Sequence, residues 1–291
     1  MKRVRDVLGS VFLPSVTVAL LWIWVIFNLA FVAWIGLQSL KTSKDIVQNP
    51  FGLPSSPQWQ NYDTVWRVGQ FAQAALNSVV ITVLGAVLIV ALAAPAAYAL
   101  ARSTRRIASP LIGFFAMGLS IPLQTLAVPI VVAKLGVSSF MVDWVTGWWD
   151  DRITLLVAEV VLSLPFAVFV LTGFFRSLPT EVEEAAEIDG ARPVRLFRSV
   201  VLPLARPGIM TVFVLNVIGL WNSALLVMLI ISDPSQRTLP VALLNLQSAM
   251  RYSADWGGLF AGIVILVYPM IVLYLWVGRR IVDGMTAGIG K

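Results

Sequence analysis

The sequence predicts an all-α, polytopic membrane protein with six transmembrane helices. Of its 291 residues, 58% are hydrophobic and 12% are charged, whereas about a quarter of the residues of soluble proteins are charged. The charges form short clusters that are separated by long uncharged tracts. Because a helix needs about 20 mainly apolar residues to cross a bilayer, this distribution indicates several membrane spans.

Six uncharged intervals are long enough to cross a bilayer. The first follows a basic start like that of a signal peptide, but its apolar run is too long for one and no A-x-A cleavage site follows. We therefore expect an uncleaved first span. Prolines within or near the intervals predict that several helices are kinked or broken. The intervals lie between Asp6 and Lys41, Arg67 and Arg102, Arg106 and Lys134, Arg152 and Arg176, Arg206 and Asp233, and Asp255 and Arg279.

The distribution of Lys and Arg predicts the orientation of these spans. Segments on one side carry 14 basic residues and those on the other side carry seven. Basic residues are enriched in cytoplasmic loops, so both termini are expected in the cytoplasm. This topology divides the chain into a cytoplasmic N-terminus at 1–12, a six-span domain at 13–278 and a cytoplasmic tail at 279–291. Within the domain, 176–206 forms a cytoplasmic loop.

Composition argues against catalysis and against several kinds of binding site. The chain contains no Cys and no His, so it lacks thiolate ligands and the commonest general base and metal ligand. We expect no metal site. The net charge of +6 is better explained by membrane topology than by nucleic acid, which is not an expected partner.

The 176–206 loop is polar but strongly patterned. Thr180 and Glu183 match the S/T-x-x-E capping box, which predicts a helix that begins near Glu181. Acidic residues crowd its first turns, where they favour the positive end of the helix dipole. Gly190 is positioned to end this helix in a left-handed conformation.

A second helix is expected to begin at Pro193, a residue type favoured at the first helical position. The first helix offers the small residues Ala185 and Ala186 beside acids, which permits close docking against another protein. A helix pair that rests on the inner leaflet through its arginines fits these features equally well. The residues alone leave both interpretations open.

The same loop resembles the EAA loop of binding-protein-dependent ATP-binding-cassette (ABC) importer permeases. That family's pattern is EAA, three residues, G, nine residues, I, one residue, LP, and the spacing matches throughout. One position departs from it, with Val where Ile is usual. The matching residues are Glu184, Ala185, Ala186, Gly190, Val200, Leu202 and Pro203.

Further segments are similar to the carbohydrate-uptake branch of this family, especially the maltose-type partner with a TAG-rich tail. They include EEAAEIDGA, FRSVVLPLARPGI, SDPSQRTLPVALLNL and the C-terminal DGMTAGIGK. In GLWNS, Ser223 stands where many relatives carry an acid. This departure weakens residue-level inference about the substrate at that position.

The resemblance implies a type I ABC importer permease fold and a coupling role for the loop. In the family, the EAA helix sits in a cleft of the cytoplasmic ATPase and transmits its closure to the spans. Glu184 would pair with a basic residue of the ATPase, Ala185 and Ala186 would pack against it, and Gly190 would form the turn. The full expected coupling set is Glu184, Ala185, Ala186, Asp189, Gly190, Leu202 and Pro203.

The resemblance also implies a set of partners. These are a second permease as heterodimer, two ATPase subunits, an extracytoplasmic solute-binding protein and the lipid bilayer of a bacterial or archaeal cytoplasmic (inner) membrane. The terminal GIGK lacks the earlier glycine and the Ser/Thr of a Walker A loop. We therefore expect no cofactor in this chain, no enzyme activity of its own, and ATP and Mg bound by the ATPase partners.

Polar residues within the spans are candidates for the solute path, because buried polar groups in membrane helices often mark pathways. Neutral amides and an aromatic face suit an uncharged polyol, although amides also join helices together. Glu159 is the one acid in the six intervals. We expect it near the outer end of span four, in a structural role rather than a transport role. The path candidates are Asn77, Ser78, Gln124, Asn216, Trp221 and Asn222.

Two other classes of transporter remain alternatives. An ABC permease for glycerol phosphate, a polyamine or an amino acid would share the EAA loop. An ion-coupled secondary carrier would need no ATPase and should carry ionisable groups near the midplane of the membrane. Glu159 is the one such group, and its expected position is off-centre.

Overall fold

A computed structural model describes residues 2–68, 70–104, 106–144, 150–253 and 255–286. The described chain is helical without strands, which confirms the all-α prediction. The helices are α1 (Lys2–Gln38), α2 (Ser43–Gln48), α3 (Gln60–Val68), α4 (Phe71–Arg102), α5 (Ala108–Gly118), η1 (Leu123–Leu126), α6 (Ala127–Trp144), α7 (Asp151–Ser177), α8 (Glu181–Ile188), α9 (Pro193–Leu196), η2 (Phe197–Val201), α10 (Leu202–Leu204), α11 (Arg206–Trp221), α12 (Leu225–Ile230), η3 (Pro234–Gln236), α13 (Leu239–Ser253) and α14 (Trp256–Thr286).

The chain divides into two compact units. The first comprises 1–69 and 245–267, and the second comprises 70–244 and 268–291. In the first unit, backbone carbonyls are satisfied by side chains. The Asn61 amide donates to the carbonyls of Ser39 and Lys41, both at 2.9 Å. Such bonds fix the irregular chain after α1, where helical hydrogen bonds end.

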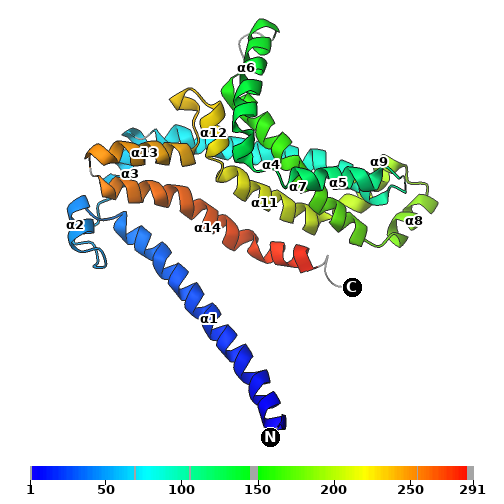
Figure 1. Cartoon of the computed structure of the whole chain (residues 1–291), viewed down its shortest axis with the longest axis horizontal. Helices are drawn as coiled ribbons and strands as arrows, with labels where there is room; N and C mark the ends of the chain where they lie inside the picture. The colour runs from blue at the N-terminus through cyan, green and yellow to red at the C-terminus, as the bar shows by residue number, and fades with distance from the viewer. Residues whose placement is uncertain (1, 69, 105, 145–149, 254, 287–291) are drawn as a thin grey trace. The chain divides into compact units, whose positions relative to one another are not determined.

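The second unit is built on α4, which packs along α7 and α11 (Figure 1). Small residues allow this close approach, since Ala93 and Ala97 of α4 are fully buried. Leu171 and Phe175 of α7 fill the same core. The three helices therefore form a continuous scaffold from one end of α4 to the other.

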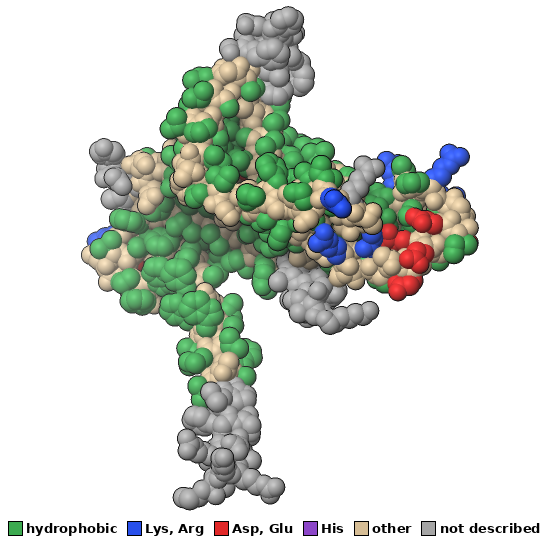
Figure 2. Space-filling view, turned by 45° about the vertical axis from the view of Figure 1, so that its right-hand side comes forward, with side chains coloured by type: hydrophobic (Ala, Val, Ile, Leu, Met, Phe, Trp, Pro, Cys, Tyr) green, Lys and Arg blue, Asp and Glu red, His purple; other side chains and the backbone are tan. Residues whose placement is uncertain are grey.

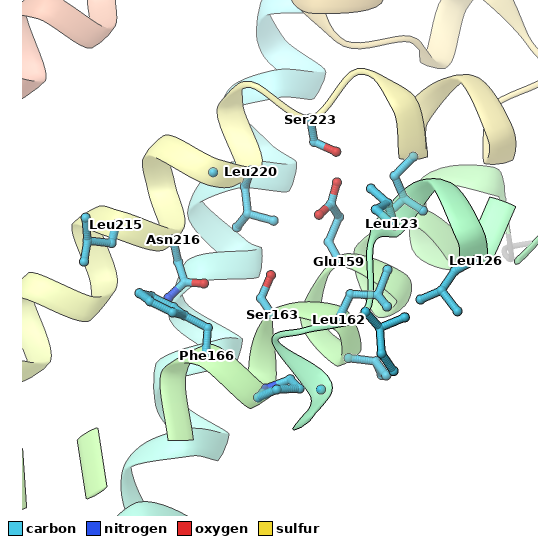
Figure 3. A pocket seen from close by; sticks show the side chains of 16 residues that line it. Leu123, Leu126, Glu159, Leu162, Ser163, Phe166, Leu215, Asn216, Leu220 and Ser223 are labelled. Atoms are coloured by element: carbon cyan, nitrogen blue, oxygen red, sulfur yellow. The ribbon is translucent and has the colours of Figure 1, made fainter. Parts of the chain in front are cut away.

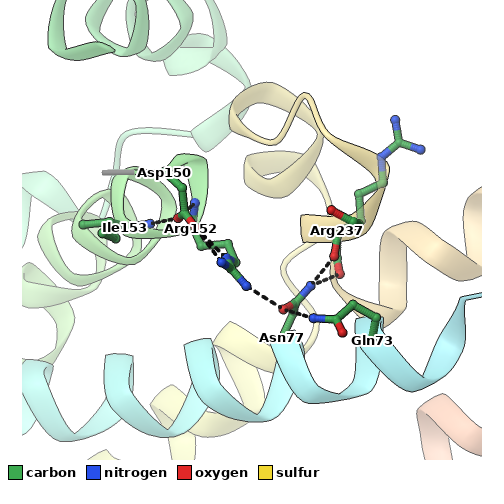
Figure 4. A network of polar contacts seen from close by, with 7 residues as sticks. Gln73, Asn77, Asp150, Arg152, Ile153 and Arg237 are labelled. Carbon is green, nitrogen blue, oxygen red and sulfur yellow. Dashed lines mark hydrogen bonds and ion pairs between the residues drawn. The ribbon is translucent and has the colours of Figure 1, made fainter. Parts of the chain in front are cut away.

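Polar side chains hold together the end of the second unit where α4 and α7 begin (Figure 4). The Asn77 amide donates to the carbonyls of Ser235 and Arg237, both at 3.0 Å. Asp150 caps α7 by accepting from the backbone N–H of Arg152 at 2.9 Å. Burial raises the pKa of Asp150, but hydrogen bonds and charge from Arg152 outweigh it and hold the pKa below its usual value.

Within the described ranges, four helices are long and apolar enough to cross a membrane as single segments. The third predicted span is bent, the fifth is divided into α11 and α12, and a further bend precedes α11, at the end of the predicted 176–206 loop. Helix α5 meets the segment 123–137 at 88°, and 193–204 meets α11 at 76°. Counting each bent pair as one span gives up to six. Pro122 lies in the first break, as expected of a residue that cannot donate a helical hydrogen bond.

Gly208 is required for the packing of α11 on α7. A Cβ at this position would lie 2.5 Å from Cγ of Phe174. We expect Gly208→Ala to destabilise the protein by about 2 kcal/mol, because overpacking forces side chains or backbone to shift. Thermal unfolding of the detergent-purified protein would measure the loss.

Gly173→Ala is the matched control for this change. A Cβ there meets no atom within 4 Å, and alanine favours the helix over glycine by about 1 kcal/mol. This variant should be as stable as the parent or slightly more stable. Equal unfolding temperatures for the two variants would contradict the proposed clash.

Candidate functional site: the α8–α10 segment and the Glu159 cavity

The α8–α10 segment, residues 181–204, joins the ends of α7 and α11. Helix α8 begins at Glu181, which confirms the predicted start. The capping-box prediction was wrong, because Thr180 has helical backbone angles and its side chain makes no cap hydrogen bond. Glu183, the partner expected in that box, is engaged with α4 instead. A tertiary ion pair thus replaces the local cap.

Gly190 ends α8 in the left-handed conformation that the sequence predicts. Its φ is 79°, and the backbone N–H of Ala191 donates to the carbonyl of Ala186 at 2.9 Å. This six-residue closure satisfies a carbonyl at the helix end. Helix α9 then begins at Pro193, also as predicted.

The two faces of α8 meet different surroundings. Glu183 and Ala186 lie three residues apart on the face that packs against the protein, and Ala186 contacts the main core. Glu184, Ala185 and Ile188 lie on the exposed face. The EAA sequence is therefore divided, with its first two residues exposed and its third half-buried.

Glu183 anchors α8 to the end of α4. Its carboxylate accepts from Arg102 Nε at 3.0 Å and from the Tyr98 hydroxyl at 2.8 Å. Arg102 also donates to the carbonyl of Leu178 at 3.2 Å. The Arg102 and Glu183 side chains retain 21% and 12% of their exposure. Such charge-assisted bonds are stronger than neutral ones, so α8 and α4 are mechanically joined.

The rest of the expected coupling set lies along the same segment. Asp189 and Pro203 are exposed, and Leu202 is half-buried against the core. The sequence indicated a capping role for Glu183, not an anchoring one, and it did not single out Ile188. Ile188 is 87% exposed beside acidic residues, and acidic side chains gather at this end of the second unit in Figure 2. An exposed aliphatic residue on a polar helix was the available signal.

Gly190→Val is expected to loosen the α8–α10 segment. No atom lies within 4 Å of a Cβ at this position, so the cost comes from the positive φ and amounts to about 1–2 kcal/mol. Limited proteolysis with trypsin should cut faster after the exposed Arg195. Gly190→Asn is the control, because Asn tolerates this conformation. Equal rates of tryptic cleavage for the two variants would contradict the proposed backbone strain at position 190.

A cavity of about 580 Å³ lies within the second unit, between α7, α11 and the chain around η1. Glu159, 7% exposed, lines it with Ser163, Asn216 and Ser223. The Ser223 hydroxyl lies beside the Glu159 carboxyl group (Figure 3). In Figure 3 both serine hydroxyls and this carboxyl group face the same space. Phe166 and several aliphatic side chains form the remaining wall.

The structure separates the path candidates into two groups. Asn77 and Ser78 are engaged at one end of α4, where the Ser78 hydroxyl accepts from the N–H of Leu239 at 2.8 Å. Asn216 lines the Glu159 cavity. Trp221 is 7% exposed and outside that lining, whereas Gln124 and Asn222 are exposed. Glu159 and Asn216 therefore line the same cavity. Ser163 and Ser223 also line it, although they were not among the path candidates.

Comparison with known proteins decides the family. Residues 89–286, most of the chain, match the model of the binding-protein-dependent transport system inner membrane component family. The chain belongs to this permease family. The match includes α8, Gly190 and all residues of the expected coupling set. The EAA resemblance is therefore confirmed, and the permease is a multi-pass membrane protein.

Two relatives are similar over nearly the whole permease. The diacetylchitobiose uptake system permease protein NgcG of Streptomyces coelicolor is 34% identical, covering 94% of this chain and 88% of the relative. The trehalose transport system permease protein SugB of Mycobacterium tuberculosis is 33% identical, covering 89% and 91%.

A solved structure supports the fold of the permease. The crystal structure of a bacterial ABC transporter involved in the import of the acidic polysaccharide alginate contains a chain that aligns with a TM-score of 0.76. The alignment covers 93% of this permease and 96% of that chain, at 22% identity. The fold is that of an ABC importer permease, as predicted.

Proposed function

We propose that this permease forms half of the translocation pathway of an ATP-driven carbohydrate importer. It couples to ATPase subunits through the α8–α10 segment. The observation that carries this proposal is the division of α8 into an anchored face and an exposed face. The anchored face is tied to α4 through Glu183, and the exposed face presents Glu184, Ala185 and Ile188.

The chemistry of the exposed face fits a helix that docks in a groove of another protein. Such contacts use a few apolar anchors surrounded by polar groups. Ile188 supplies the anchor, Ala185 permits close approach, and Glu184 offers a carboxylate to a basic residue. Movement of a docked α8 would reach α4 directly, because Arg102 and Tyr98 hold the same helix.

The proposed assembly contains this permease, a second permease, two ATPase subunits and an extracytoplasmic solute-binding protein. ATP and Mg are bound by the ATPase subunits, and this chain has no ATPase site of its own. Both termini and α8 lie on the cytoplasmic side of the inner membrane. The twofold excess of Lys and Arg on that side supports this orientation.

A carbohydrate is the proposed cargo. The relatives NgcG and SugB are named for diacetylchitobiose and trehalose, and both sugars are uncharged and rich in hydroxyl or amide groups. The described cavity around Glu159 carries hydroxyl, amide and carboxyl groups beside an aromatic ring. This combination suits a polyhydroxylated solute.

The test is purification and reconstitution of the complex encoded with this chain. We expect ATPase subunits to co-elute with the permease in detergent, and proteoliposomes to import labelled trehalose or diacetylchitobiose only with ATP and the binding protein. A complex that imports a glycerol phosphate, a polyamine or an amino acid instead would overturn the cargo. Uptake driven by an ion gradient without ATP would overturn the importer itself.

A further inference from the structure

Glu159 is buried, and it differs from the described partly buried acids of the second unit, which all have a basic partner. Glu183 pairs with Arg102, Asp151 with Lys134, and Asp150 with Arg152. Within the described residues, Glu159 has no basic partner within ion-pair distance, and the Ser223 hydroxyl faces its carboxyl group (Figure 3). A buried carboxyl group without a cation costs free energy, and an acid inside a membrane span is by default a functional candidate.

The surroundings of Glu159 suit hydroxyl groups better than ions. No Lys or Arg lines the cavity, so an anionic solute would lack a counter-charge. No cluster of three metal-binding side chains occurs in the described ranges. A polyamine would call for several carboxylates, whereas this cavity holds one. A carboxylate can accept several hydrogen bonds, and each serine hydroxyl can donate and accept.

The apolar lining complements these polar groups. Phe166 and Leu220 face the cavity with Ser163 and Glu159 (Figure 3). Sugars present hydroxyl groups at their edges and C–H groups on their faces, so a site with both kinds of wall matches them. Pockets for small molecules measure about 300–1,000 Å³, and the cavity of about 580 Å³ falls in this range.

We propose that Glu159, Ser163 and Ser223 form a subsite that binds the hydroxyl groups of an uncharged sugar during its passage. Phe166 contacts the apolar face of that sugar. This inference rests on the proposed importer function and adds a substrate class to it, namely neutral rather than acidic or cationic carbohydrate. It also assigns Glu159 a transport role, whereas the sequence alone favoured a structural one.

The first experiment compares ATP hydrolysis with sugar uptake in proteoliposomes that contain the complete complex and its binding protein. Glu159→Gln should lower the uptake of labelled trehalose or diacetylchitobiose about tenfold, the usual effect of weakening a hydrogen bond to a charged group. ATP hydrolysis stimulated by the binding protein should stay within about twofold, because α8 is unchanged. Asp63→Asn, at an exposed acid paired with Arg67, should change neither.

A second experiment reads occupancy of the cavity without disturbing Glu159. The chain has no Cys, so Leu123→Cys, at a lining position outside the proposed subsite, creates a single thiol in it, and mass spectrometry can follow labelling by a small thiol reagent. The transported sugar should slow labelling at this site but not at Thr64→Cys, an exposed position on α3. Leu126→Cys is a second reporter in the same cavity.

The outcomes separate the subsite from the importer function. If the parent complex hydrolyses ATP but imports neither sugar, the proposed cargo fails. If it imports sugar while Glu159→Gln transports at the parental rate, or while sugar leaves labelling of both cavity reporters unchanged, the subsite fails alone. Import of acidic alginate oligosaccharides at a rate similar to that of the neutral sugars would also overturn the substrate class.

Discussion

Glu184→Lys should abolish ATP-driven uptake while the permease still inserts and folds. Glu184 is exposed on α8, so its replacement disturbs no internal contact. Reversing a charge that pairs with a basic residue at an interface costs about 3 kcal/mol, which corresponds to roughly a hundredfold weaker docking. The measurements are ATP-dependent sugar uptake in proteoliposomes and co-elution of the ATPase subunits.

Glu187→Lys is the matched control for this reversal. Glu187 is also an exposed acid of α8 and lies outside the EAA pattern. It should retain most of the uptake, and both variants should match the parent in membrane yield. If Glu184→Lys takes up sugar at the rate of the parent, the exposed face of α8 has no coupling role.

Arg102→Glu should also stop transport, for a different reason. The change places two carboxylates together where Arg102 now joins Glu183 to α4. Losing one partner of a buried ion pair costs about 3 kcal/mol or more. Helix α8 should therefore detach from α4, so that ATP hydrolysis continues without sugar uptake or the ATPase subunits are lost.

The exchanged pair tests this connection directly. Combining Arg102→Glu with Glu183→Arg restores opposite charges, and we expect uptake to recover in part. Recovery should be incomplete because Arg102 also bonds the carbonyl of Leu178. A coupling free energy on the order of 2 kcal/mol is typical of residues in direct contact. If the double variant takes up no more sugar than Arg102→Glu alone, the pair does not transmit movement from α8 to α4.

Local features of α8 were predictable because their causes lie within a few residues. The acids of its first turn, Gly190 and Pro193 each act through the backbone or the helix dipole. The structure accordingly confirms the start of α8, the left-handed turn and the start of α9. Only the Thr180 cap was wrong, since Glu183 found a partner far away in the sequence.

The sequence could not predict which acid of α8 is anchored. Glu183 and Glu184 are adjacent and chemically equivalent, and periodicity alone does not say which face meets the protein. Arg102, 81 residues away, makes the choice by pairing with Glu183. This pairing fixes which face of α8 is turned toward the protein, and Ile188 lies on the opposite, exposed face.

The sequence by itself determined the helical class, most of the apolar segments and the EAA pattern, because hydropathy and short motifs act over one or a few helical turns. Prolines predicted broken spans, but only the tertiary structure decided the angles of the two bends and the cavity. Glu159 and Ser223 are 64 residues apart in the sequence, and packing of α7 against α4 and α11 brings them together. Contacts between residues so far apart in the sequence depend on side-chain packing across the whole core, which a local sequence pattern does not predict.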